Sequence, residues 1–282
     1  MFKDVCENMI NSFSENVPRA EKEYLDEEGI LRCAVCHDRV EFMAGVPELN
    51  IPARKVRCIC SCVQKERDAH KERERQQEIE RMRNVCFDEA EMHEWTFGND
   101  DRRNAKMSDA MERYAEMFED FKKESKGLLL YGPVGTGKSY YAASIANRLI
   151  DKGVPVIMTD FSTLINNLQG MFEGKQEYIS NLNRYPLLII DDLGIERKTE
   201  YVVEIVYNVI NSRYKSGLPF IITTNISPEE IKKPQDVAYS RIYDRILERC
   251  FPVEVKVDVA GGSRRRQKLK DTHADVKARL GL

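Results

Sequence analysis

The sequence predicts an α/β protein in which a five-stranded parallel sheet is preceded by a small cysteine-rich module and a helical linker. Three observations predict this fold class. Short apolar runs alternate with amphipathic stretches over residues 85–260, which is typical of strands and helices built around a parallel sheet. Most of the cysteines gather between residues 33 and 62, and an almost wholly charged stretch, residues 63–84, separates the two regions.

The composition limits the class of protein. The 282 residues leave room for one large and one smaller domain, and 42% apolar residues suffice for a packed core. A net charge of -3 excludes a uniformly basic coat for nucleic acid. The segment Met1–Phe13 carries charged residues where a signal peptide has its apolar core, and no run approaches the roughly 18 apolar residues of a membrane span. We therefore expect a cytoplasmic protein with no membrane partner.

Residues 1–62 are expected to form a short helix and a metal-binding cysteine cluster. The spacing is C-x-x-C at residues 33–36 and C-x-C-x-C at residues 58–62, and thiolates in such pairs suit tetrahedral Zn²⁺. Five cysteines compete for four places, and His37 is a further ligand candidate. An iron–sulfur cluster and a metal-free cluster are the alternatives. A metal would act structurally, because so small a segment needs a crosslink such as a bound metal ion to fold.

Residues 63–84 are expected to form a charged helical linker. Opposite charges recur there at i,i+3, as in Glu72/Arg75 and Glu80/Arg83, which supports a solvated helix. The stretch has no sustained apolar stripe, which argues against a long coiled coil.

Residues 85–260 are expected to form the α/β domain itself. Apolar residues recur on one helical face from Ala105 to Lys122, and further helices are expected over residues 140–150 and around residues 202–210. Five apolar runs predict the strands, at residues 127–131, 154–158, 187–190, 219–224 and 251–257.

A glycine-rich motif follows the first of these strands and matches G-x-x-x-x-G-K-[ST] in full. Glycines let successive backbone N–H groups face the phosphates of a nucleotide, and the following helix directs its positive N-terminus at them. Lys138 can then reach the β- and γ-phosphates, and the Ser139 hydroxyl can ligate Mg²⁺. The expected nucleotide contacts are Gly132, Pro133, Val134, Gly135, Thr136, Gly137, Lys138, Ser139 and Tyr140.

The third strand ends in two carboxylates, a second feature of nucleotide hydrolysis. Because ligands of a parallel sheet gather at the carboxyl ends of its strands, we expect Asp191 to hold Mg²⁺ through water and Asp192 to act as general base. The alternative is a pair of solvated turn aspartates.

Two further features distinguish this domain from a generic P-loop kinase. Asn225 ends an apolar strand and could orient the attacking water. Arg241, Arg245 and Arg249 recur at i,i+4 on one helix face, where an arginine supplied to a neighbouring subunit would stabilise charge on the transferred phosphoryl group. An ordinary solvated basic face is the alternative for these arginines.

These residues together resemble the AAA+ superfamily of P-loop NTPases, and more closely the DnaC/DnaI-type helicase loaders and their phage relatives. The matching segments are GLLLYGPVGTGKSYYAASIANRLI, LLIIDDLGIERKTEYVVEIVYNVINSRY, LPFIITTN and SRIYDRILERC, within residues 85–260. The resemblance implies a Mg-dependent ATPase with Asn225 as sensor 1 and an arginine finger in the Arg241/Arg245 pair, with Arg245 the first choice. It also implies that Trp95–Phe97 closes over adenine.

The resemblance extends to the cysteine module and to partners. Related loaders carry C-x-x-C followed by C-x-C, which implies that zinc is held by Cys33, Cys36, Cys60 and Cys62, with Cys58 in reserve. The implied partners are a hexameric DnaB-type replicative helicase, gripped by the N-terminal module, single-stranded DNA, and further copies of the chain in an ATP-dependent oligomer.

The end of the sequence is a basic tail, residues 261–282, which contains sensor 2 candidates between Gly261 and Arg265. Such a tail could bind phosphate backbones or simply be solvated. Three functions follow for the whole chain. They are a helicase loader in DNA replication, an IstB-type transposition helper ATPase, and a metal-binding adaptor with little ATPase activity. The cysteine module favours the first over the second, and the intact phosphate loop argues against the third.

Overall fold

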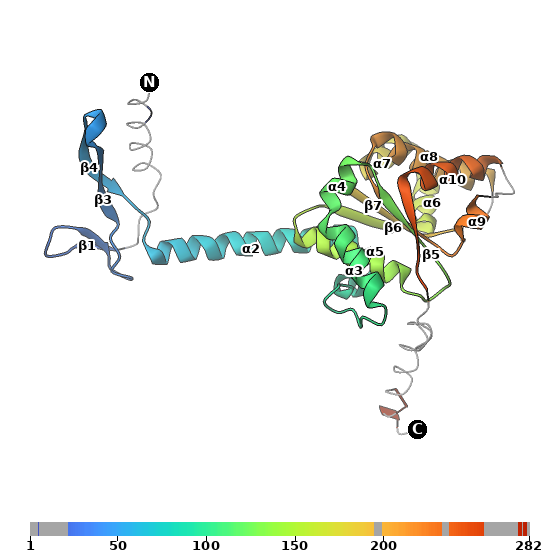
Figure 1. Ribbon diagram of the computed structural model, residues 1–282, viewed down its shortest axis with the longest axis horizontal. Helices are drawn as coiled ribbons and strands as arrows, with labels where there is room; N and C mark the ends of the chain where they lie inside the picture. The colour runs from blue at the N-terminus through green and yellow to red at the C-terminus, as the bar shows by residue number, and fades with distance from the viewer. Residues whose placement is uncertain are drawn as a thin grey trace. The chain divides into compact units, whose positions relative to one another are not determined.

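The computed structural model describes residue 5 and residues 22–194, 199–232, 237–256, 276–277 and 279–280. Two compact units make up the chain, Met1–Glu78 and Ile79–Leu282 (Figure 1). Most of the expected N-terminal helix, the sensor 2 candidates and most of the basic tail lie outside the described residues.

The first unit contains two short antiparallel ribbons. Strand β1 (Glu23–Leu25) pairs with β2 (Leu31–Cys33), and β3 (Glu41–Val46) pairs with β4 (Ile51–Arg57). A 3-10 turn, η1 (Pro47–Leu49), joins β3 to β4. The sequence patterns did not predict these ribbons, because β1 and β2 have only three residues each and β3 and β4 alternate poorly. A small buried cluster holds the unit together, made of Cys33, Val40 and Cys60.

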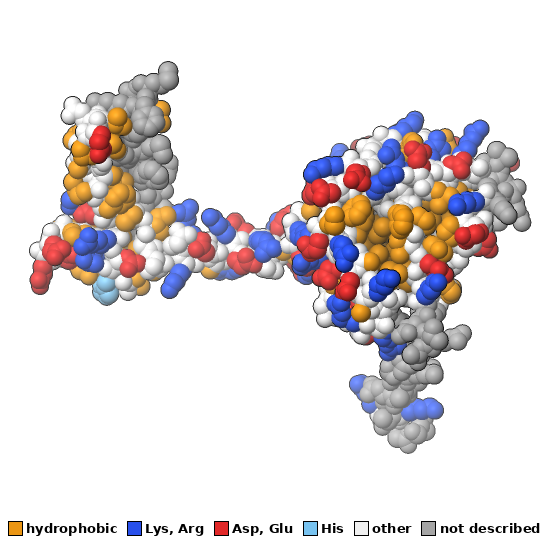
Figure 2. Space-filling model, viewed as in Figure 1, with side chains coloured by type: hydrophobic (Ala, Val, Ile, Leu, Met, Phe, Trp, Pro, Cys, Tyr) orange, Lys and Arg blue, Asp and Glu red, His pale blue; other side chains and the backbone are white. Residues whose placement is uncertain are grey.

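The predicted linker is part of one helix, α2 (Ser61–Cys86), along which both signs of charge are exposed (Figure 2). Glu72 and Arg75 form the expected i,i+3 ion pair at 3.5 Å. The second unit begins within this helix, at Ile79, because Ile79 and Cys86 are buried in the core of that unit.

The second unit is built on a five-stranded sheet in which all strands are parallel, as predicted. The strand order is β6-β7-β8-β5-β9, which places β5 between β8 and β9. Because parallel strands end at one edge, the loops after β5, β7 and β8 meet there. The strands are β5 (Gly127–Tyr131), β6 (Val156–Asp160), β7 (Leu187–Leu193), β8 (Phe220–Thr224) and β9 (Cys250–Glu254).

Helices cover both faces of the sheet, and each face has its own buried core (Figure 1). Alternate residues of β5 divide between the two cores, with Leu129 in one and Leu128 and Leu130 in the other. One core packs α6 (Phe161–Gly170), α7 (Lys175–Leu182), α8 (Glu200–Ser216), α9 (Pro228–Ile231) and α10 (Val237–Arg249). The other packs α3 (Ala105–Glu116), α4 (Phe118–Lys123) and α5 (Lys138–Asp151), with the 3-10 turn η2 (Ala90–Glu94) beside it.

The helix expected over residues 105–122 is interrupted at Met117, which ends α3 and precedes α4. The interruption allows Tyr114 to stack on Phe121, with ring centroids 4.7 Å apart, while Phe118 is buried. Packing of these aromatic rings therefore overrides the continuous helical pattern.

Arg213 is a buried charge that the sequence patterns did not single out. Arg213 lies in α8, and the residue is 1% exposed. All its hydrogen bonds go to backbone carbonyls, from 2.7 to 3.3 Å, and burial lowers its pKa to about 9, so it stays charged at neutral pH. The accepting oxygens belong to Leu182, Tyr185, Pro186 and Pro219. The side chain thus joins the loops that precede β7 and β8.

Arg213→Met is expected to lower the free energy of unfolding by about 3 kcal/mol, because buried carbonyl oxygens lose their donor. Urea denaturation followed by circular dichroism measures this. Lys215→Met on the same helix is the control, since Lys215 is exposed, and it should change stability by less than about 0.5 kcal/mol. Equal midpoints for the two variants would contradict a structural role for the guanidinium.

Candidate functional site

The loop after β5 has the backbone geometry that phosphate binding requires. Gly132, Gly135 and Gly137 have φ angles of 145°, 80° and 97°, which favour glycine. A Cβ on Gly132 would lie 2.4 Å from the carbonyl oxygen of Val255. Helix α5 follows Gly137, which has no side chain to cap it, so the positive N-terminus of the helix faces the loop.

Lys138 is held at the centre of this loop. Its side chain is 6% exposed, and its Nζ donates to the carbonyl oxygens of Gly132 and Pro133, each at 3.0 Å. The same Nζ donates to Oδ1 of Asn225 at 2.8 Å. Burial lowers the pKa of Lys138. The strand order explains the contact with Asn225, because β8 is paired with β5 and Asn225 follows β8 directly.

A hydroxyl and a carboxylate meet beside the lysine. Ser139 Oγ donates to Oδ1 of Asp191 at 3.0 Å. Burial raises the pKa of Asp191, against the hydrogen bonds from Thr223 and Ser139 that lower it. A hydroxyl and a carboxylate in contact are ligands that suit Mg²⁺.

Thr223 is a site residue that the sequence analysis missed. Its hydroxyl donates to Asp191 and accepts a hydrogen bond from the backbone N–H of Asp192, at 2.9 Å. It is fully buried in β8. The pairing of β7 with β8 shifts between Ile190 and Leu193, and Asp192 has a φ of 57°. Thr223 thus fixes both aspartates at a distorted strand end, and the signal for it was a polar residue within an apolar strand.

The segment Trp95–Phe97, which is expected to close over adenine, is hydrogen-bonded to helix α5. Tyr140 Oη donates to the carbonyl oxygen of Thr96 at 2.8 Å, and the rings of Tyr140 and Trp95 are 6.0 Å apart. Asn147, which is buried, donates through Nδ2 to the carbonyl oxygens of Met92 at 2.9 Å and Trp95 at 3.0 Å. Asn147 is a second residue that the sequence patterns did not reveal.

The arginine pair lies on α10. Arg241 is exposed, whereas Arg245 is half-buried against α8. Within the described ranges, no hydrogen bond or ion pair joins either side chain to residues 132–139 of the same chain.

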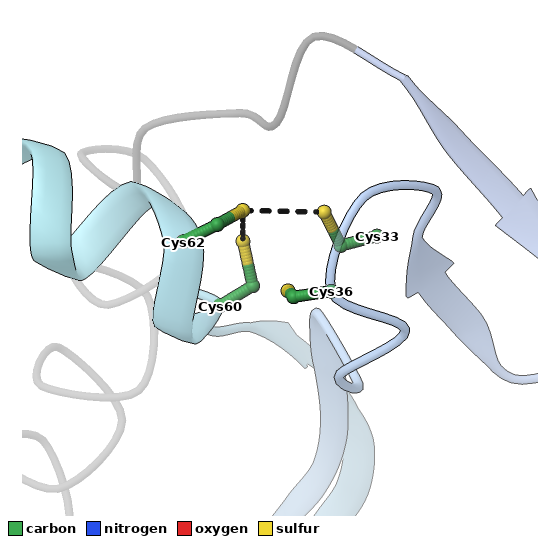
Figure 3. A group of neighbouring side chains, drawn as sticks. All are labelled: Cys33, Cys36, Cys60 and Cys62. Atoms are coloured by element: carbon green, nitrogen blue, oxygen red, sulfur yellow. Dashed lines mark hydrogen bonds between the residues drawn. The ribbon is translucent and has the colours of Figure 1, made fainter.

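The first unit brings four cysteine sulfurs together. Cys33 ends β2 and Cys36 lies in the turn after it. Cys60 directly precedes α2 and Cys62 lies in its first turn, and the four side chains point toward one another (Figure 3). All four Sγ atoms lie within 4.8 Å of one another. Tetrahedral zinc with Zn–S bonds of about 2.3 Å requires sulfurs about 3.8 Å apart, so this cluster fits the ion.

The surroundings of the cluster affect its thiols unequally, because burial raises the pKa of Cys60 and hydrogen bonds with Cys60 and Cys33 raise the pKa of Cys62 to about 12. Backbone N–H groups of Asp38 and Cys62 lower the pKa of Cys36 to about 6. Cys33 also accepts a hydrogen bond from the backbone N–H of Val35 at 3.4 Å. The fifth cysteine, Cys58, points elsewhere, with its Sγ 3.3 Å from the carbonyl oxygen of Arg39. The geometry thus gathers the four cysteines that the resemblance implied and leaves Cys58 outside.

The phosphate loop and the paired aspartates lie in a region that matches a known protein family. A family model described as IstB-like ATP binding protein matches residues 57–271. The chain belongs to this family. The IstB-like chain is therefore an ATP-binding protein, and its phosphate loop lies within the matched region.

Relatives of this IstB-like protein include replicative helicase loaders. The replicative helicase loader DnaI of Bacillus subtilis (strain 168) is 28% identical over 144 residues, covering 47% of this chain and 46% of DnaI. The replicative helicase loader DnaC of Escherichia coli (strain K12) is 25% identical over 141 residues, covering 49% of this chain and 56% of DnaC. The chain thus spans about half the length of these curated relatives.

A solved structure agrees with the sequence relatives. The crystal structure of DnaI matches with a TM-score of 0.53 and 25% identity, over 65% of this chain and 99% of that one. The predicted resemblance to this group and the predicted AAA+ fold class are therefore confirmed. Across the described residues, no helix is both long and apolar enough to cross a membrane.

The fit of the cysteine cluster to zinc leads to a paired prediction. The purified chain is expected to contain about one zinc ion, Cys36→Ser is expected to lose it, and Cys58→Ser is expected to keep it. Metal content is measured by mass spectrometry. Because the buried cluster of the first unit is so small, metal loss should also expose residues 22–60 to hydrogen exchange. Equal loss of zinc from both variants would remove the assignment of the four ligands.

Proposed function

We propose that this IstB-like chain is an ATP-dependent loader of a hexameric DnaB-type replicative helicase onto single-stranded DNA, working in the cytoplasm. The observation that carries the proposal is a phosphate loop packed against two strand-end aspartates and Asn225, on the same chain as a zinc-suited module. In that site Ser139 contacts Asp191 and Lys138 contacts Asn225. The helicase loaders among its relatives support the choice of partner.

In this function, each segment of the chain would have a separate role. Residues 1–62, with zinc on Cys33, Cys36, Cys60 and Cys62, would grip the helicase. Residues 63–84 would link that module to the ATPase domain, residues 85–260. The tail, residues 261–282, would contact phosphate backbones through its basic side chains.

The residues of the site have separate roles in ATP hydrolysis. Lys138 would exchange its bonds to the loop carbonyls for bonds to the β- and γ-phosphates. Mg²⁺ held by Ser139 and, through water, Asp191 would neutralise charge on the same phosphates. Asp192 would accept a proton from the attacking water, and Asn225 would orient that water.

Hydrolysis is proposed to require a second copy of the chain. Arg245 of one copy would stabilise the charge that develops on the γ-phosphate in the site of the next copy, with Arg241 as the second candidate. ATP binding would thereby order the subunit interface, and hydrolysis would release the assembly and leave the helicase on DNA.

The family description supports a second candidate, a transposition helper ATPase. The two functions differ in the partner that the cysteine module captures. A tagged full-length chain, incubated with host lysate with and without ATP and analysed by mass spectrometry, is expected to capture the replicative helicase. Cys36→Ser should lose the helicase while keeping ATP binding, and Cys58→Ser should keep both. Capture of a transposase, with no helicase, would replace the first function by the second.

A further inference from the structure

The guanidinium of Arg245 is held by two tyrosines of α8. Its Cζ lies 4.8 Å from the ring centre of Tyr207 and 5.7 Å from that of Tyr214. Its Nη2 donates to the hydroxyl of Tyr207 at 3.2 Å, and its Nη1 donates to the backbone carbonyl of Arg241, also at 3.2 Å. A side chain with four rotatable bonds is thus restrained by two ring faces and two hydrogen bonds.

The second tyrosine is itself fixed from two sides. The Tyr214 hydroxyl donates to both carboxylate oxygens of Glu248, at 2.8 and 2.9 Å. Arg249 lies over the Tyr214 ring, with its Cζ 4.6 Å from the ring centre. The ring that Arg245 contacts is therefore anchored independently of Arg245.

The tyrosines restrain Arg245 without neutralising it. Over the described part of the chain, no carboxylate lies within 4.0 Å of the Arg245 guanidinium, although Arg83 and Arg148 each pair with an acid. Glu248, an acid on the same helix, accepts from Tyr214 instead. An aromatic face attracts a cation through its quadrupole and leaves the charge intact. A charge kept in this way is available to a phosphate group.

The burial of Arg213 shows what a purely structural arginine looks like in this same fold. Arg213 is 1% exposed and bonded to carbonyl oxygens throughout. Arg245 is only half-buried, and among the described residues it uses two of its five N–H groups, one on Nη1 and one on Nη2, in hydrogen bonds. The remaining donors distinguish it from a guanidinium that only fills the core.

We infer that Tyr207 and Tyr214 are positioning residues, which pre-orient the Arg245 guanidinium for the ATP site of a neighbouring copy. The inference rests on the proposed function, in which Arg245 acts in trans. Restraining the side chain before the subunits meet removes rotamer entropy that the assembly would otherwise lose. Both tyrosines act through Arg245 and have no contact with the nucleotide in this scheme.

The first test separates ATP binding from hydrolysis. Tyr207→Ala in the full-length chain is expected to keep the ATP affinity, because Lys138 and Ser139 are untouched, and to lower kcat about tenfold. Tyr207→Phe keeps the ring and loses only the hydroxyl acceptor, so most of the activity should return. Tyr201→Ala is the matched control, because Tyr201 lies on the same helix and holds Lys175 at 5.3 Å instead of Arg245. It should hydrolyse ATP at the wild-type rate.

The second test asks in which subunit the tyrosine acts. The Tyr207→Ala variant has an intact ATP site, but its Arg245 is not restrained. The Lys138→Ala variant cannot hydrolyse ATP, but its Arg245 is restrained. A mixture of the two is expected to hydrolyse ATP faster than the average of the separate proteins, because Lys138→Ala copies supply Arg245 to Tyr207→Ala copies. If Tyr207→Ala fails to bind ATP, Tyr207→Leu, which keeps a bulky side chain without a π face, replaces it in both tests.

The outcomes distinguish the inference from the proposed function. A wild-type rate for Arg245→Ala would end the proposed trans mechanism itself. Loss of activity in Arg245→Ala with a wild-type rate in Tyr207→Ala would overturn only the positioning role. A faster rate in Tyr207→Ala would also overturn it, because the tyrosines would then restrain Arg245 away from the reaction. Absence of recovery in the mixture would place the action of Tyr207 within its own ATP site.

Discussion

Lys138→Ala is expected to weaken ATP binding by about a hundredfold or more and to abolish hydrolysis. The lysine Nζ lies within 3.0 Å of two loop carbonyls and Asn225, at the position from which it would bond the phosphates. Two charge-assisted hydrogen bonds of about 1.5 kcal/mol each correspond to that factor. Titration with a fluorescent ATP analogue measures the affinity, and phosphate release measures the rate.

Lys152→Ala is the matched control for this prediction. Lys152 caps the other end of the same helix and pairs with Glu116 at 2.7 Å. It should bind ATP with the wild-type affinity. An unchanged affinity in Lys138→Ala would mean that the loop after β5 does not hold the nucleotide, and both proposals about hydrolysis would fail with it.

Arg245→Ala is expected to lower ATP hydrolysis by about a thousandfold while sparing ATP affinity, as arginines supplied in trans typically do. Single-turnover hydrolysis at several protein concentrations measures the effect, since a site completed by a neighbour requires assembly. The substitution also removes the contacts with Tyr207 and Tyr214, so the free energy of unfolding should fall by about 1 kcal/mol. Denaturation of the same sample separates this loss from the catalytic one.

Arg241→Ala provides the contrast for this prediction. Arg241 lies one turn earlier on α10 and is exposed. If hydrolysis survives in Arg245→Ala and collapses in Arg241→Ala, the finger is Arg241. Equal and small effects in both variants would indicate that the chain completes its site without a neighbouring arginine.

The sequence predicted best those structural features that are determined by residues adjacent to one another in the chain. The phosphate loop was predictable because its glycine conformations and the following helix N-terminus are contained within Gly132–Ser139. The strands of the sheet were predictable because five apolar runs are too short for helices and alternate with amphipathic stretches. The boundaries were less accurate, and β9 ends at Glu254 instead of residue 257.

Predictions that depended on the competition between local pattern and packing were less successful. The helical pattern over residues 105–122 is continuous, yet the helix is interrupted at Met117, and Tyr114 stacks on Phe121. The ribbons of the first unit were missed because β1 and β2 are very short and β3 and β4 show no regular alternation of apolar and polar residues.

By itself, the sequence determined which chemistry this protein carries: a phosphate loop, two carboxylates at a strand end, and cysteines in metal-binding pairs. Only the tertiary structure decided which of these groups meet. Placing β5 beside β8 brings Asn225 to Lys138, the pairing of β7 with β8 brings Thr223 to Asp191, and the packing of α8 on α10 places Tyr207 over Arg245. The reason is that motif spacing is encoded along the chain, whereas strand order and helix packing depend on contacts between residues far apart in sequence, which no local pattern records.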